Sequence, residues 1–225
     1  MIDLNKKAVI KKRVIRTMTA LEKNNIKAFY VENKEDVNAL IKSLLNDGDI
    51  ISFGGSETLK DCDVFSLIKN GDYTVLDRSK EGITQEDIQK IYRDTFSADV
   101  YFSGANAITE NGYIYNVDGN GNRVAAITFG PKSVILVAGY NKIVPNLKAA
   151  ERRIKEVAAP ANCLRLNCDT PCAKTGRCIS LCKDVREMAD GCENERRICA
   201  SYSVLGRQRV KDRIKVILVG EELGY

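Results

Sequence analysis

Apolar residues recur at helical spacing near the start of the chain. Over residues 5–24 they are Val9, Ile10, Val14, Ile15, Met18 and Leu21. This spacing predicts an amphipathic helix, and the turn-prone pair Asn24-Asn25 predicts where it ends.

Beyond that helix, short apolar runs alternate with further helical stretches. The runs that predict strands are residues 26–31, 50–53, 73–76, 99–102, 113–117, 133–138 and 213–219. The stretches that predict helices are residues 34–46, a segment ending at Leu67, residues 84–96 after the capping residue Thr84, and residues 146–158, ended by Pro160. This alternation favours an α/β fold with a parallel-rich sheet flanked by helices.

The pattern changes after Pro160. Seven of the eight cysteines lie between Cys163 and Cys199, among polar and charged residues with little periodicity. The apolar run at 213–219 then restores the earlier pattern. We therefore expect a single domain over residues 1–225, with a Cys-rich insertion at 161–200 and a last strand that returns to the core sheet.

Composition narrows the class of protein. The chain has 225 residues, of which 44% are hydrophobic and 29% charged, as is typical of soluble globular proteins. The net charge of +5 comes from basic residues interleaved with apolar ones, which favours solvated helix faces over a nucleic-acid surface. Without a long apolar run or a signal-peptide pattern, we expect a cytoplasmic protein with no membrane span. Cysteines stay reduced there, so eight of them favour metal binding or redox chemistry.

The chain contains no histidine. That absence excludes His-based catalytic triads and HExxH metal sites. Any proton transfer must therefore use Asp, Glu, Lys, Tyr or Cys.

Four predicted strands are each followed directly by glycine, asparagine or aspartate residues. These segments are residues 53–56, 104–107, 117–123 and 137–142. The carboxyl ends of parallel strands line one crevice, where backbone N–H groups favour a phosphate or carboxylate. Lys142 and Arg123 could add charge-assisted contacts. The alternative is that these glycines only make turns.

The same segments carry a family resemblance. The matching stretches are residues 52–56 with Thr58-Leu59, 106–112, 118–123, 129–132, Gly139 with Asn141-Lys142, and 219–225. In this combination the chain resembles the lactate-utilisation (LUD) domain family, in its longer form with a Cys-rich C-terminal segment. The resemblance implies a fold similar to the isomerase and CoA-transferase (NagB/RpiA-like) group and a link to lactate oxidation. The candidate ligand-binding residues are Gly54, Gly55, Ser56, Asn106, Thr109, Gly119, Asn120, Gly121, Asn122, Arg123, Gly139, Asn141 and Lys142.

Two carboxylates are candidate catalytic residues. The stretch 109–112 is similar to the Ser-Glu-Asn-Gly motif of CoA-transferases, whose glutamate attacks an acyl-CoA, so Glu110 is a candidate nucleophile. Asp118 could act beside it as a base or orient a substrate. The alternatives are that Asn111-Gly112 closes a hairpin with Glu110 exposed, and that Asp118 accepts backbone N–H groups in the glycine loop.

The cysteines have irregular spacing. No pair shows the C-x-x-C spacing that structural zinc sites favour. Residues 170–178, with Cys182 and Arg197-Ile198-Cys199, resemble the Cys-rich segment of longer LUD proteins. That resemblance implies Cys172, Cys178, Cys182 and Cys199 as ligands of an iron–sulfur cluster or zinc. Cys192 is the replacement for Cys182, because the spacing departs from the family pattern by one residue; free buried thiols are the alternative.

Three functions follow from these features. The favoured one is an accessory subunit of lactate oxidation to pyruvate, which binds a small anionic ligand (carboxylate, phosphate or CoA-like) and meets iron–sulfur partner subunits. The second is a CoA-transferase or isomerase that uses Glu110 and Asp118. The third is a metal- or redox-sensing protein.

Overall fold

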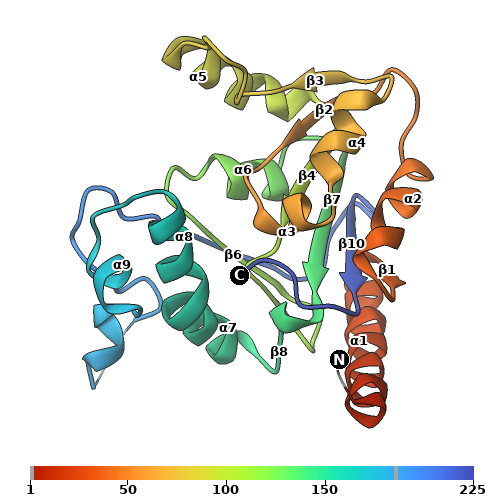
Figure 1. Ribbon diagram of the computed structural model, residues 1–225. Coiled ribbons are helices and arrows are strands. Elements are labelled where there is room, and N and C mark those ends of the chain that lie inside the picture. Colours follow the sequence, from red (N-terminus) through yellow and green to blue (C-terminus); the bar gives the residue numbers. More distant parts are fainter. Residues whose placement is uncertain (1–2, 185–186) are drawn as a thin grey trace.

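A six-stranded parallel sheet forms the centre of the computed structural model, which describes residues 3–184 and 187–225 (Figure 1). Its strand order is β1-β10-β7-β4-β2-β3, and every neighbouring pair is parallel. The strands are β1 (Lys27–Val31), β2 (Ile50–Phe53), β3 (Thr74–Leu76), β4 (Val100–Gly104), β7 (Ser133–Gly139) and β10 (Ile214–Val219). The prediction of an α/β fold with a parallel-rich sheet is confirmed. The last strand, β10, lies between β1 and β7.

Helices cover both faces of this sheet. They are α1 (Leu4–Lys23), α2 (Val37–Lys42) after a short 3-10 turn (Lys34–Asp36), α3 (Glu57–Asp61), α4 (Val64–Asn70), α5 (Gln85–Asp94), which runs into a 3-10 turn (Thr95–Ser97), and α6 (Asn122–Thr128). Alternate residues of β7 separate the two core layers. Ile135 and Val137 pack with α2, α3 and α4, whereas Val134 and Leu136 pack with α1 and α6.

The first helix behaves largely as its pattern predicts. The Asp3 carboxylate caps α1 by accepting the backbone N–H groups of Asn5 and Lys6. Val14 and Leu21 are fully buried, but Val9 and Ile15 are exposed. The apolar face is therefore narrower than the sequence suggests.

A second sheet of four strands was not expected. Its order is β8-β5-β6-β9, with β5 (Ala107–Thr109), β6 (Ile114–Asp118), β8 (Ile143–Val144) and β9 (Ser201–Leu205). The predicted strand at 113–117 therefore lies outside the parallel sheet. The link from β5 to β6 is too short for a parallel crossover, so the two strands form an antiparallel hairpin instead.

The helix predicted to stop at Pro160 continues past it. A π-helical turn (Ile154–Ala158) joins α7 (Leu147–Arg153) to α8 (Ala159–Arg165). In that turn the Ala159 N–H donates to the Ile154 carbonyl five residues back, which widens the helix just before Pro160. Pro160 stands in the first turn of α8, where a residue without an N–H is tolerated.

The Cys-rich segment follows α8. It includes α9 (Pro171–Thr175) and a 3-10 turn (Ile179–Cys182) before it reaches β9. Figure 1 places α7, α8 and α9 together on the left of the view, on the opposite side from α1 and β1. No helix among the described residues is long and apolar enough to span a membrane.

Candidate functional site

A cavity of about 530 Å³ opens at the carboxyl edge of the parallel sheet. Its walls come from the segments that follow β2, β3, β4 and β7, from the end of β6, and from α8 and the Cys-rich segment. This volume lies in the range of small-molecule sites, and the carboxyl edge is where parallel sheets usually bind ligands.

Many of the residues expected to bind a ligand lie around this cavity. They are Gly55, Ser56, Asn106, Gly119, Asn120, Asn122, Arg123 and Lys142, and the candidate catalytic residue Asp118 lies beside them. The loops after β2, β4, β6 and β7, which are separated in the sequence, therefore meet at one place.

Other expected site residues are used in packing. Gly139 lies so close to the C-terminal segment that a Cβ there would be 2.5 Å from the Glu221 carbonyl oxygen. The Asn141 amide holds the same segment through the backbone of Leu223 and Gly224.

Three more lie elsewhere. Gly54 packs against Tyr101 and Arg123, Thr109 accepts the Tyr113 N–H in the hairpin, and Gly121, in the left-handed region, precedes α6.

Glu110 lies away from the cavity lining. Its carboxylate accepts from Arg13 Nε at 2.8 Å and Arg16 at 3.3 Å, both on α1. Asn111 and Gly112 close the β5–β6 hairpin, and the Gly112 N–H donates to the Thr109 carbonyl. The structure thus ties Glu110 to the first helix.

Asp118 borders the cavity but also holds a helix. Its Oδ2 accepts the backbone N–H groups of Arg123 at 2.9 Å and Val124 at 3.4 Å, at the start of α6. The structure therefore does not bring Glu110 and Asp118 together at one reaction centre.

Arg123 joins the two sheets from inside the cavity wall. Its guanidinium donates to the carbonyls of Gly104 and Val117 and to the amide oxygens of Asn106 and Asn116, at 2.7–3.2 Å. All four acceptors are neutral, so the positive charge of Arg123 is not compensated by a hydrogen-bonded carboxylate.

Lys142 is the most deeply buried cationic side chain of the lining, at 3% exposure. Its Nζ donates to Thr58 Oγ1 at 2.6 Å, and no ion pair joins it to a carboxylate of the described residues. Burial, together with the nearby Arg153 and Arg123, lowers the pKa of Lys142 to about 7. The protonated amine lacks the anion that would stabilise it.

Sequence reasoning missed much of the positive charge. The lining also includes Arg78 after β3, Arg165 on α8, and Arg196 and Arg197 from the Cys-rich segment. Among the described residues, five arginines and Lys142 thus line the cavity, against three acidic side chains, Glu57, Asp118 and Glu195. The only sequence signal was that Arg78 closely follows a predicted strand end.

The comparisons with known proteins bear on this arrangement. The family model described as the LUD domain matches residues 14–219. The chain belongs to the LUD domain family. The family resemblance predicted from the sequence is thereby confirmed.

Several solved structures resemble this LUD chain at low sequence identity. A DUF162 family protein from Deinococcus radiodurans is 15% identical, covers 95% of this chain and 98% of its own, and has a TM-score of 0.49. eIF2B beta from Chaetomium thermophilum is 14% identical over 50% of this chain and 43% of its own, with a TM-score of 0.36. The translation initiation factor eIF-2B of Pyrococcus horikoshii is 18% identical over 50% and 48%, with a TM-score of 0.33. No curated protein matches the chain.

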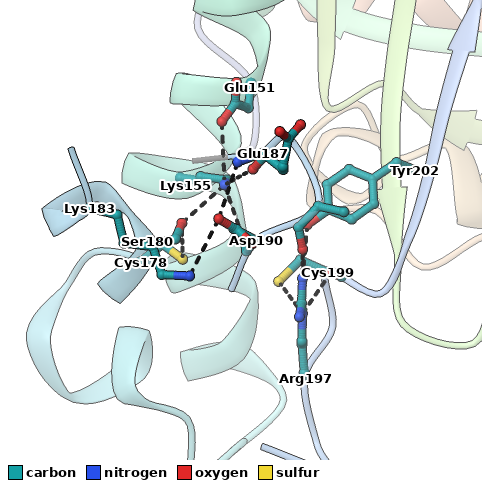
Figure 2. Close-up of polar contacts among 11 residues, drawn as sticks. Glu151, Lys155, Cys178, Ser180, Lys183, Glu187, Asp190, Arg197, Cys199 and Tyr202 are labelled. Atoms are coloured by element: carbon teal, nitrogen blue, oxygen red, sulfur yellow. Dashed lines mark hydrogen bonds and ion pairs between the residues drawn. The ribbon is translucent and has the colours of Figure 1, made fainter. Parts of the chain in front are cut away.

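Three thiols of the Cys-rich segment of this LUD chain lie close together. Cys163 and Cys172 lie together, with Sγ atoms 3.7 Å apart, and Cys168 packs beside them. Burial raises the pKa of the Cys163 thiol to about 12, so it stays protonated. Cys199 accepts from Arg197 Nε at 3.3 Å (Figure 2).

The four expected metal ligands are not gathered. Cys182 is exposed and contacts Arg177, away from the others. Three of the expected ligands, Cys172, Cys178 and Cys199, border a small apolar cavity together with Cys192, the replacement considered for Cys182. In the described part of the chain, no three His, Cys, Asp or Glu side chains are placed to hold a metal ion.

Lys155 holds this segment in place through hydrogen bonds and an ion pair. It is 3% exposed, and its Nζ contacts Ser180 Oγ at 3.0 Å, the Asp190 carbonyl at 2.9 Å and Glu151 at 3.3 Å (Figure 2). Unlike Lys142, it has a carboxylate partner. Lys155 therefore fixes the Cys-rich segment to the π-helical turn.

Proposed function

We propose that this chain binds a small anionic metabolite in the cavity at the carboxyl edge of the sheet, as an accessory subunit of lactate oxidation to pyruvate. Membership of the LUD family supports a role related to lactate utilisation. Our proposal goes further in two respects: that the chain binds an anionic ligand, and that it is a subunit of a complex.

The observation that supports this proposal is that cationic side chains of the cavity lining have no carboxylate partner among the described residues. Arg123 and Lys142 are held only by neutral acceptors. A buried cation without a partner is costly, and a bound anion would remove that cost. Among the other arginines of the lining, Arg165 forms an ion pair across it, with Glu57 at 3.8 Å, and it is the only one that does so in the described part of the chain.

The cavity favours carboxylates that carry additional polar groups. Asn106, Asn120 and Ser56 line it with neutral donors and acceptors. A hydroxy or oxo acid could bind its carboxylate at the arginines and its second oxygen at these groups. The volume of about 530 Å³ also leaves room for a phosphorylated or CoA-linked ligand.

The transferase alternative finds less support in the arrangement of Glu110. A nucleophilic carboxylate must face its substrate, whereas both Glu110 oxygens accept from arginines of α1. A role for Glu110 in holding α1 against the hairpin accounts for these contacts.

Calorimetric titration with L-lactate, pyruvate, phosphate and CoA tests the proposal. Arg78→Ala and Arg165→Ala should each weaken binding about 10-fold or more, since hydrogen bonds to charged groups contribute about 1.5–3 kcal/mol. Arg209→Ala, an exposed arginine outside the lining, is the matched control and should bind normally. Folded protein that binds none of these anions would refute the proposal.

A second candidate concerns the Cys-rich segment. Cys172, Cys178, Cys192 and Cys199 border one cavity, beside the cationic side chains Lys155 and Arg197. We propose that these thiols bind zinc or an iron–sulfur cluster in this cavity after their side chains have turned toward the cavity. As arranged here they do not form a ligand set. The adjacent cations would offset the charge of metal-bound thiolates.

Metal and acid-labile sulfide analysis of protein purified without oxygen tests this candidate. Cys192→Ser should lower the metal content, whereas Cys182→Ser should leave it unchanged. The opposite result would restore the ligand set implied by the family resemblance. Protein without metal would refute the candidate altogether.

A further inference from the structure

Lys142 stands at a distinctive position in the fold. It ends the 3-10 turn (Tyr140–Lys142) directly after β7, a strand in the middle of the parallel sheet. Its side chain is 3% exposed, yet it belongs to the lining of the main cavity. The amine is therefore withdrawn from bulk water and open to a ligand in the cavity.

The surroundings of the amine favour its neutral form. Arg153 and Arg123 are the nearest cations, and Asp61 is the carboxylate that acts on it from a distance. The Asp61 carboxylate accepts the Gly224 N–H, and Lys142 itself bonds to the neutral Thr58 hydroxyl. With a pKa of about 7, about half of the amine is unprotonated at neutral pH. The unprotonated amine is the nucleophilic form.

Two glycines lie close to the nitrogen. A Cβ at Gly104 would lie 3.7 Å from Lys142 Nζ, and a Cβ at Gly224 would lie 3.4 Å from it. Gly104 is itself part of the cavity lining. Those Cβ positions are already filled, by Ser56 Oγ at 2.7 Å and Thr58 Oγ1 at 2.6 Å, so a carbonyl carbon would have to reach the amine from the cavity itself.

We propose that Lys142 forms an imine with a 2-oxo acid bound in the cavity. The ligand class rests on the proposed function, since the arginines of the lining would hold the carboxylate. The amine lone pair attacks the ketone carbon, a C–N bond forms, and the C=O π electrons move to oxygen. Both amine protons then leave with that oxygen as water, and the C=N bond remains.

The imine would let the protein distinguish the two acids of the lactate–pyruvate pair. Both carry a carboxylate, so the arginines bind them alike. Only the oxo acid has an electrophilic carbonyl carbon for Lys142. A 2-hydroxy acid at the same site leaves the amine free.

Borohydride trapping tests this inference. The full-length protein is incubated with pyruvate, reduced with sodium borohydride, and mapped by peptide mass spectrometry. One reduced pyruvate should be attached to Lys142, and L-lactate should give no adduct. Lys155 is equally buried but lies outside the cavity lining, so it is the internal control and should stay unmodified.

Two further measurements make the result decisive. Lys142→Met should abolish the adduct, and circular dichroism shows whether that variant is folded. Calorimetric binding of pyruvate with Lys142 left unmodified would overturn the imine but leave the proposed function standing. Absence of binding by every anion tested would overturn both. Equal labelling of exposed lysines would mark the reaction as unspecific and overturn the inference.

Discussion

Replacing Lys142 by methionine should stabilise the protein at pH 7. Burial lowers the pKa of the amine from 10.5 to about 7, so ionisation favours the unfolded chain. With about 1.4 kcal/mol for each pH unit between these pKa values, this penalty is about 4–5 kcal/mol at pH 7. Methionine has a similar length and no charge, so the variant escapes the penalty.

The same change removes one favourable contact. The Lys142 amine donates to Thr58 Oγ1, and loss of a hydrogen bond between such groups costs about 1–2 kcal/mol. The net gain of Lys142→Met at pH 7 is then about 3 kcal/mol in the free energy of unfolding.

The pH dependence identifies the cause of the gain. Between pH 7 and about pH 10 the unfolded chain holds a proton that the folded chain has lost, so wild-type stability rises with pH. At pH 9.5 the ionisation penalty falls to about 1 kcal/mol, and the advantage of the variant should vanish.

Urea unfolding under reducing conditions at pH 7.0 and pH 9.5 measures both values. Lys155→Met is the matched control, because Lys155 is equally buried but pairs with Glu151. It should be destabilised at both pH values. If Lys142→Met is also destabilised equally at both, Lys142 is a charged and compensated residue, and the reasoning fails.

Three further predictions concern the hairpin and the glycine loop. Glu110→Gln should lower the free energy of unfolding by about 1 kcal/mol, because it weakens the pairing with Arg13 and Arg16. The affinity for anions, measured by calorimetry, should stay unchanged, and a large loss of affinity would contradict this. Gly112→Ala should lower the free energy of unfolding by more than about 2 kcal/mol, because Gly112 has φ 78° and a Cβ there would lie 2.5 Å from the Ala20 backbone. An unchanged midpoint of chemical unfolding would contradict this prediction. Asp118→Ala should lower the unfolding free energy by about 1 kcal/mol, since α6 loses its cap, and Asp118→Asn should recover most of it.

The strands of the parallel sheet were predictable because each is a short apolar run followed by turn residues. β7 and β10 are buried on both faces, so their near-continuous apolar runs identified them. In the second sheet, β6 was predicted as the strand at 113–117, whereas β5, β8 and β9 were not predictable from their own residues. β8 has two residues, and β9 is mostly half-exposed and polar, so pairing with β6 defines it as a strand.

The candidate site was predictable where it depends on local chain geometry. Glycines after strand ends indicated the loops at Gly55, Gly104 and Gly119. The charge of the cavity depends on contacts between distant segments. Arg165 reaches it because α8 continues past Pro160, and no short-range pattern signals that.

Glu110 shows how a contact between distant segments changes the interpretation of a motif. Its motif suggested a nucleophile, but the decisive neighbours, Arg13 and Arg16, lie 97 and 94 residues away in the sequence. The Asn111-Gly112 pair did favour a hairpin, and the hairpin is present. A motif fixes the local backbone, whereas the partner that a side chain meets is set by the packing of α1.

Arg197 connects the two candidate sites. It lines the anion cavity, and its guanidinium also donates to Cys199 Sγ and to the Cys199 and Cys192 carbonyls. An anion in the cavity and a thiolate or metal at Cys199 would therefore act on the same positive charge. A ligand at either proposed site would change the electrostatic environment of the other, and by linkage the effect on binding free energy would be reciprocal. The Cys-rich segment is thus part of the wall of the main cavity and would influence an anion bound there.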